Sequence, residues 1–181
     1  MYSDDELYRG FIAGDTTAYD KLMIRYGDSL TCYLKGFLYS LEDAEDMMIE
    51  AFAEIMAKKP MIKEGNFKSY LFRVGHNLVY HHYKKTERLE VFSLDEIDEE
   101  LPDGENFEDK ILKDEREKAL HRCISRIDPE LREAIWLVFF ENLSYENASE
   151  IMGIKKKKLD NLLMKAKKQL KAELEKEGIR N

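Results

Sequence analysis

Lysines gather near the C-terminal end of the sequence, between residues 155 and 171. This segment holds eight lysines and one acid, Asp160, so its local formal charge is +7. Ammonium groups at this density suit the phosphates of a nucleic-acid backbone, which attract cations largely without regard to base sequence. The segment therefore predicts a contact with DNA or another polyanion.

Two amphipathic segments would position these lysines. Ser144 can cap a short helix with Ala148, Ile151 and Met152 inward, and Gly153 suits the left-handed turn that ends it. The next helix buries one stripe: Leu159, Leu162, Leu163, Ala166 and Leu170. A helix, a glycine turn and a basic helix are the pattern of a helix-turn-helix, whose second helix enters a DNA major groove. We expect these residues to contact DNA: Lys156, Lys157, Lys158, Asn161, Met164, Lys165, Lys168 and Lys171.

A second group of basic and polar residues is interleaved with aromatic ones between residues 68 and 85. The basic and polar members are Lys68, Arg73, His76, Asn77, His81, Lys84 and Lys85. The aromatic members are Tyr70, Phe72, Tyr80 and Tyr83. Basic groups hold phosphates and aromatic faces stack on unpaired bases, so the mixture suits a DNA strand that is being opened. The alternative is that most of the aromatic side chains belong to the core, as we expect for Tyr70.

A third cluster is acidic. Asp43, Glu45, Asp46 and Glu50 lie on or near one side of a predicted helix that also carries Ile49. The cluster is either a surface for a basic partner or an ordinary solvated face. Ile49 helps to separate the two, since an exposed isoleucine favours an apolar contact with a partner and a buried one indicates only core.

Other kinds of site find little support. His76, His81 and His82 point in different directions on a helix without a completing carboxylate or thiol, so we expect no metal and no cofactor. Cys32 and Cys123 are expected to be reduced core thiols. No arrangement of nucleophile and base indicates an enzyme. No apolar run is long enough to span a bilayer, which favours a cytoplasmic protein without membrane insertion.

The first half of the chain reads as a helical bundle. The periodicity predicts helices over residues 4–13, 15–37, 42–58 and 67–85, with a loop between the last two. Helices resume near Glu115, and Asp128 with Pro129 marks a helix start. The residues expected to face the core after that start are Leu131, Ile135, Val138 and Phe139.

Charge is distributed unevenly along the 181 residues. The net formal charge is −8, yet residues 94–117 hold twelve acids against three basic residues, a local −9. Periodicity also weakens between Thr86 and Asp114, which is typical of a tether. We therefore predict an all-α protein with a helical bundle at 1–88, an acidic linker at 89–114 and a helix-turn-helix domain at 115–181.

Three segments resemble one family. Residues 43–52, DAEDMMIEAF, resemble the region-two helix of extracytoplasmic-function (group IV) RNA polymerase sigma factors. Residues 67–78, FKSYLFRVGHNL, are similar to that family's promoter-melting helix. Residues 143–146, LSYE, with the Gly153 turn and residues 165–167, are similar to its region-four helix-turn-helix. The motifs occur in the family's order across nearly the whole chain.

This resemblance implies a non-enzymatic subunit that directs bacterial core RNA polymerase to promoters and assists their opening. The acidic residues of 43–50 with Ile49 would bind the polymerase clamp. The basic and polar residues of 68–85 would bind the minus-ten element, with Asn77 at the position that contacts an extruded base, and the loop 59–66 would be the minus-ten specificity loop. The lysine-rich helix would bind the minus-thirty-five element. An anti-sigma factor is a further possible partner.

Several residues depart from the family's pattern. Ile49 stands where glutamine is usual, Leu162 where arginine is frequent, and Lys155–Lys158 where serine or threonine caps the recognition helix. These departures keep two alternatives open. The chain could be a sigma-like regulator that binds polymerase without initiating, or a stand-alone helix-turn-helix regulator, although the latter leaves the first domain unexplained.

Overall fold

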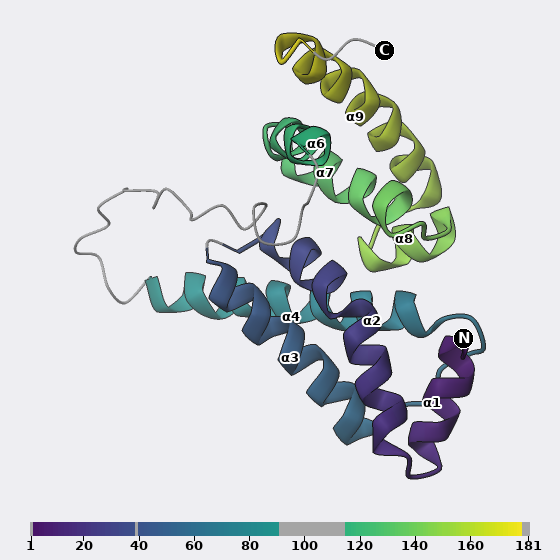
Figure 1. Ribbon diagram of the computed structural model, residues 1–181. Coiled ribbons are helices and arrows are strands. Elements are labelled where there is room, and N and C mark those ends of the chain that lie inside the picture. The colour runs from purple at the N-terminus through teal and green to yellow at the C-terminus, as the bar shows by residue number, and fades with distance from the viewer. Residues whose placement is uncertain (1, 39, 91–114, 179–181) are drawn as a thin grey trace.

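A computed structural model describes residues 2–38, 40–90 and 115–178 of the chain. Within these ranges every regular element is a helix and no strand occurs, as the periodicity predicts. Figure 1 shows two groups of helices, one from each half of the sequence, stacked on each other.

The N-terminal group is a bundle of α1 (Asp4–Ile12), α2 (Thr16–Lys35), α3 (Leu41–Lys58) and α4 (Phe67–Glu90). The apolar stripes of these helices meet in one core. Its largest fully buried side chains include Leu22, Leu30, Phe52, Phe67 and Phe72. Both α2 and α4 contact all three other helices of the bundle.

Side-chain caps fix where these helices begin. Ser3 forms a capping box with Glu6 at the start of α1. Asp15 accepts hydrogen bonds from the backbone N–H groups of Thr17 and Ala18 at the start of α2. The predicted start of α2 after Asp15 is therefore confirmed.

The C-terminal group consists of α6 (Glu115–Ser125), α7 (Pro129–Ile135), the π-helix η1 (Trp136–Phe140), α8 (Tyr145–Ile151) and α9 (Lys156–Lys176). Ser144 caps α8 by accepting a hydrogen bond from the Asn147 N–H at 3.1 Å, as predicted. Gly153 has φ +65°, the left-handed conformation expected at the helix-turn-helix turn.

The prediction that Phe139 faces the core of this group is wrong. Phe139 is about half exposed, whereas Leu137 is completely buried in its place. The cause is η1, because a π-helix has more residues per turn than an α-helix and shifts which side chains face inward. Leu131, Ile135 and Val138 are buried as expected.

The predicted tether also begins later than its composition suggested. α4 continues as a helix to Glu90, since residues 86–90 contain neither glycine nor proline to stop it. Most of the expected acidic linker, residues 91–114, lies outside the described residues. The domain boundaries at 88 and 114 therefore stay predictions.

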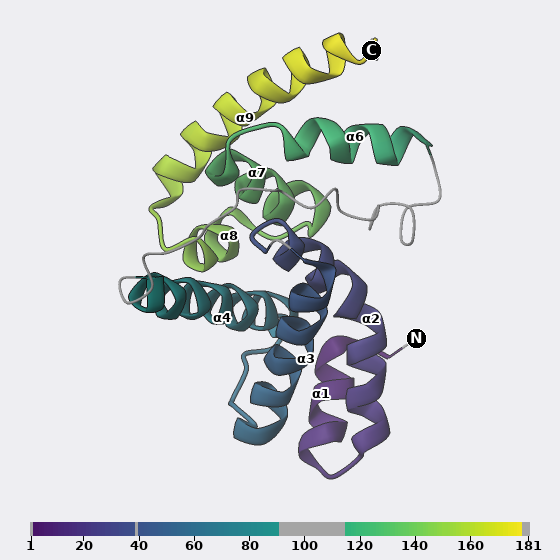
Figure 2. The same cartoon turned by 90° about the vertical axis from the view of Figure 1, so that its left-hand side faces the viewer.

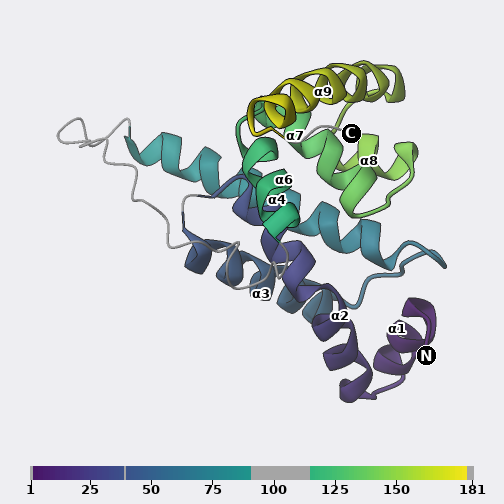
Figure 3. The same ribbon diagram turned by 45° about the horizontal axis from the view of Figure 1, so that its top comes forward.

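The two groups pack directly against each other. α8 lies across α4, and this contact is the main one between the halves. Figures 2 and 3 show the helix-turn-helix end of the second group resting on α4, with α9 on the outer side of the molecule. Three of the residues on α4 that were predicted to meet DNA, Lys68, Arg73 and His76, therefore lie against the second domain.

Candidate DNA and polymerase interfaces

The outer side of α9 presents the predicted basic surface. Its apolar residues Leu159, Leu162, Leu163 and Ala166 are buried, and Leu170 is partly buried. That packing leaves the opposite side free. All eight predicted contact residues are exposed: Lys156, Lys157, Lys158, Asn161, Met164, Lys165, Lys168 and Lys171.

Some of these lysines have local partners. Lys158 pairs with Glu130 at 2.5 Å and Lys156 with Glu146 at 3.3 Å. Lys157, Lys165 and Lys168 form no ion pair within the described residues. The charges most available to phosphates are therefore those of Lys157, at the start of α9, and of Lys165 and Lys168, in its middle.

The start of α9 is uncapped. Lys155 occupies the cap position with extended backbone geometry, φ −75° and ψ 146°, and makes no side-chain hydrogen bond there. The four lysines at this end also oppose the helix dipole. Lysine at position 155, where the family has serine or threonine, thus destabilises the start of α9.

Replacing Lys155 by serine should stabilise the chain. A serine cap contributes about 1 kcal/mol, which corresponds to a rise in Tm of ~2–4 °C, measurable by calorimetry. The matched control is Lys157→Ser, which removes the same charge from the first turn without gaining a cap. Equal gains from both variants would show that charge, and not capping, is responsible.

The predicted minus-ten residues divide into two sets along α4. Asn77, His81 and Lys84 are exposed, whereas Lys68, Arg73 and His76 are partly buried. Lys85 lies within α4, but its side chain is outside the described residues. Tyr70, expected in the core, is partly buried against it. The partly buried set faces the second domain.

Each member of this set contacts a glutamate of the second domain. The Lys68 ammonium lies 2.9 Å from the Glu141 carboxylate and 2.7 Å from the Glu141 carbonyl oxygen. The Arg73 guanidinium lies 2.5 Å from the Glu150 carboxylate. We call Glu141, Glu150 and Glu133, described next, the interdomain glutamates.

Glu133 completes the set through His76. Its carboxylate lies 3.0 Å from His76 Nδ1 and accepts a hydrogen bond of 2.9 Å from the Tyr33 hydroxyl. The Glu133 side chain is only 10% exposed. Burial first, and the charge of Glu133 second, raise the pKa of Tyr33, so its hydroxyl stays a donor.

Glu141 is the most deeply buried of the three, with 4% of its side chain exposed. It also accepts a hydrogen bond from the Trp136 indole at 3.1 Å. Burial and the nearby Glu141 charge together raise the pKa of Cys32 to about 12, so little of this thiol is thiolate at neutral pH. A buried carboxylate needs such partners, and Lys68 supplies the compensating charge.

A cavity of about 600 Å³ lies beside these contacts. Met61, Lys63, Tyr70 and Arg73 line it from the first domain, while Ser144, Asn147 and Ile151 line it from the second. The loop before α4 and the helix-turn-helix therefore border the same cavity.

The acidic cluster on α3 is exposed as predicted. Asp43, Glu45, Asp46 and Glu50 all lie at the surface, and Ile49 is 51% exposed among them. None of the four acids forms an ion pair within the described residues. An exposed apolar side chain on the same helix as four unpaired carboxylates suits a partner that offers both basic and apolar groups.

Family models match both domains. The sigma-70 region 2 model matches residues 22–89, and the sigma-70 region 4 model matches residues 117–170. The chain belongs to the sigma-70 family. A sigma factor directs bacterial core RNA polymerase to promoters, and sigma factors are in general non-enzymatic initiation factors.

Relatives place this sigma factor in the extracytoplasmic-function (ECF) group. The RNA polymerase sigma-H factor of Pseudomonas aeruginosa is 29% identical over 163 residues, which cover 82% of this chain and 82% of that protein. The ECF RNA polymerase sigma factor SigE of Mycolicibacterium smegmatis is 26% identical over 162 residues, which cover 87% of this chain and 63% of that protein.

The fold of the sigma factor is also similar to a solved one. The sigma factor RpoE of Bartonella quintana, crystallised with the anti-sigma factor NepR, matches with a TM-score of 0.64 and 17% identity. The match covers 87% of this chain and 96% of that one. Among the described helices of the sigma factor, none carries an apolar stretch that could cross a bilayer, and no group of metal-binding side chains gathers in the described ranges.

Sequence reasoning missed the interdomain glutamates. Glu133 and Glu150 are ordinary acids in amphipathic helices, Glu141 directly follows η1, and no local signal distinguishes the three from solvated residues. Only the contacts between the two domains show their partners.

Proposed function

We propose that this sigma factor binds core polymerase through the α3 acidic cluster and Ile49, opens the minus-ten element with α4, and reads the minus-thirty-five element with α9. The observation that carries the assignment is that each of these surfaces is presented by a helix whose other side is packed in the core. The side chains available to DNA and polymerase are thus fixed by the fold.

The exposed part of α4 supports strand opening. Asn77 offers both a donor and an acceptor to a base edge, and it lies beside exposed Tyr80 and His81 on the same helix. Tyr80 is 60% exposed, so its ring is accessible for base stacking. This group combines base recognition with stacking.

With its two domains arranged as in the free chain, the protein cannot bind both promoter elements at once. The two elements are separated by roughly 25 base pairs, which is about 85 Å of duplex at ~3.4 Å per base pair. Here α8 of the helix-turn-helix packs directly on α4, with Arg73 and Glu150 2.5 Å apart. Promoter binding therefore requires the domains to separate.

Separation would also release basic residues of α4 for DNA. In the free chain the interdomain glutamates pair with Lys68, Arg73 and His76. These are residues that the proposed function assigns to contacts with DNA. DNA phosphates would replace carboxylates as their partners. The free chain thus holds a closed form that exchanges its internal ion pairs for DNA contacts.

Replacing Asn77 by alanine should impair promoter opening. Loss of a contact that uses both donor and acceptor costs ~1–3 kcal/mol, so open-complex formation should fall roughly tenfold or more. Permanganate reactivity of unpaired thymines on promoter DNA, with core polymerase present, measures the effect.

The control for this experiment is Asp20→Ala, which changes an exposed residue of α2. Binding of both variants to core polymerase should equal that of the unaltered chain. If the unaltered chain bound core but formed no open complex on any promoter, the non-initiating regulator would be the correct function. The buried Leu162, at a position where the family often reads bases, is the observation that keeps this alternative in view.

We further propose a protein partner of the anti-sigma class, because a sigma factor of similar fold was crystallised with one. The proposed site of action is the cytoplasm, where core polymerase transcribes. We assign no enzymatic reaction and no cofactor to the chain itself.

A further inference from the structure

The loop between α3 and α4, residues 59–66, has a defined shape. Lys59 ends α3 in the left-handed conformation with φ 44°, and Gly65 has φ +75°. Between them Met61 is fully exposed, whereas Ile62 packs against the core. The resemblance to sigma factors implies that this loop carries minus-ten specificity, and the proposed opening of the minus-ten element by α4 places the loop next to that DNA. Whatever fixes the shape of the loop then also affects which bases it meets.

The first end of the loop is held by α1. The Tyr8 hydroxyl donates a hydrogen bond of 2.7 Å to the Pro60 carbonyl oxygen. The Lys59 ammonium lies 5.1 Å from the centre of the Phe11 ring, a cation–π contact. Burial raises the pKa of Tyr8, so its hydroxyl remains protonated and able to donate.

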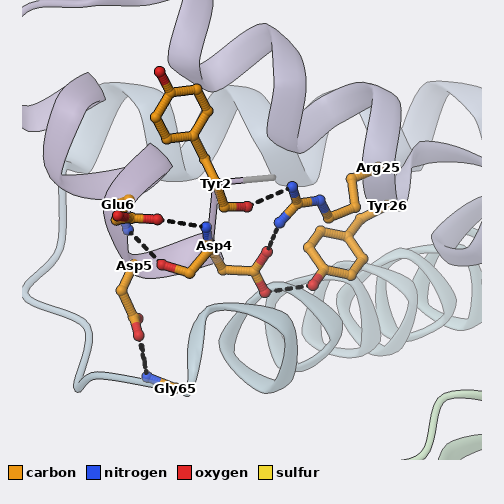
Figure 4. A network of polar contacts seen from close by, with 8 residues as sticks. Tyr2, Asp4, Asp5, Glu6, Arg25, Tyr26 and Gly65 are labelled. Atoms are coloured by element: carbon orange, nitrogen blue, oxygen red, sulfur yellow. Dashed lines mark hydrogen bonds and ion pairs between the residues drawn. The ribbon is translucent and has the colours of Figure 1, made fainter.

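The second end of the loop is held by the same helix. Both Asp5 carboxylate oxygens accept the Gly65 N–H, at 2.9 and 3.0 Å. Figure 4 shows Asp5 reaching from α1 to Gly65 across the gap between the two segments. Asp5 and Tyr8 are three positions apart, so they lie on the same side of α1.

Other residues fix α1 independently of the loop. Asp4 accepts hydrogen bonds from Arg25 and Tyr26 of α2, and Arg25 also donates to the Tyr2 carbonyl oxygen at 2.8 Å. Figure 4 shows Asp4 and Asp5 pointing to different partners, α2 and the loop. α1 is therefore a fixed support, anchored on one side and bound to both ends of the loop on the other.

We propose that Asp5 and Tyr8 are positioning residues for minus-ten recognition: they clamp the two ends of loop 59–66 and so set the geometry in which its exposed residues meet bases. This inference rests on the proposed function. It extends the determinants of promoter selectivity to an N-terminal helix that reads no bases itself.

The test compares selectivity among minus-ten sequences. Transcription with core polymerase from promoters randomised at the minus-ten element should show that Asp5→Ala and Tyr8→Phe flatten the preference between the best and mismatched sequences by about threefold or more, in the range of a single lost hydrogen bond. Asp5→Asn retains an oxygen that can accept the Gly65 N–H and should restore much of the preference.

The matched control is Asp4→Asn, which weakens the anchoring of α1 on α2 and leaves the loop contacts intact. Unchanged preference in Asp5→Ala and Tyr8→Phe would overturn the proposal. So would an equal loss in Asp4→Asn, because the effect would then follow α1 docking and not the clamp.

A spectroscopic measurement tests the clamp without transcription. A spin label attached through Met61→Cys, in a chain that also carries Cys32→Ser, reports loop motion, since the remaining cysteine, Cys123, is buried. Asp5→Ala should raise the mobility of the label, and Asp4→Asn should raise it less. Unchanged mobility would overturn the clamp. A chain that selects no minus-ten motif, with a clamp confirmed by the label, would instead refute the proposed function and the base-reading role that depends on it.

Discussion

Replacing Glu133, Glu141 and Glu150 together by glutamine should separate the two domains of the free chain and tighten its binding to single-stranded DNA at least about tenfold. A site that is available only in a minor open form binds with an affinity reduced by the fraction of that form. The three glutamates occupy Lys68, Arg73 and His76 in the closed form. Removing them both weakens the closed form and frees the DNA-binding residues.

The size of this effect follows from burial. Removing one partner of a buried ion pair costs ~3–5 kcal/mol, and Glu141 is 96% buried beside Lys68. A tenfold change in affinity needs only about 1.4 kcal/mol. Even if the exposed pair of Arg73 with Glu150 contributes little, the Lys68 pair alone can supply the difference.

Two measurements check the prediction. Small-angle X-ray scattering should show a larger radius of gyration for the triple variant, and fluorescence anisotropy should show tighter binding of a labelled oligonucleotide. The control is a triple variant of Glu54, Glu173 and Glu177 to glutamine, which removes the same charge from ion pairs that each lie within one domain and involve no residue assigned to DNA. If the two triple variants behaved alike, net charge would explain the result and the closed form would have no role.

Reversing the charge of Lys165 and Lys168 to glutamate should abolish contact with upstream promoter DNA and leave polymerase binding intact. Both side chains are exposed on the middle of α9 and free of ion pairs within the described residues. If four to six lysines of the unaltered domain contact phosphates, its log–log salt dependence has a slope of roughly −4 to −5. Loss of two contacts should bring the slope about two closer to zero.

Footprinting of the upstream element and a salt titration of binding measure this effect. Lys21→Glu with Lys176→Glu is the matched control, because it makes the same change of formal charge on α2 and on the last turn of α9. An unchanged footprint in the Lys165 and Lys168 variant would show that another surface contacts this DNA, and the assignment of α9 would be wrong.

The helices and most of the candidate surfaces could be predicted because their signals are local. The caps at Asp15 and Ser144 and the turn at Gly153 depend on a few neighbouring residues, as does the buried stripe of α9. Exposure of the lysines follows directly from that stripe. The sequence also raised the question of Ile49, and the structure answers it by leaving the side chain half exposed.

The contacts between the two domains and between α1 and loop 59–66 could not be predicted, because they join residues far apart in the chain. Lys68 and Glu141 are 73 positions apart, Arg73 and Glu150 are 77 apart, and Asp5 and Gly65 are 60 apart. No periodicity connects such residues. The exposure of Phe139 was missed for a different reason, because the π-helix η1 breaks the 3.6-residue spacing on which the prediction relied.

Reconstitution of this chain with bacterial core RNA polymerase, followed by transcription from a library of random promoters, tests the central claim most directly. The account predicts transcripts whose promoters are enriched in two short motifs, one near minus ten and one near minus thirty-five. Binding to core without transcripts would contradict initiation, and no binding to core would contradict the assignment of all three surfaces.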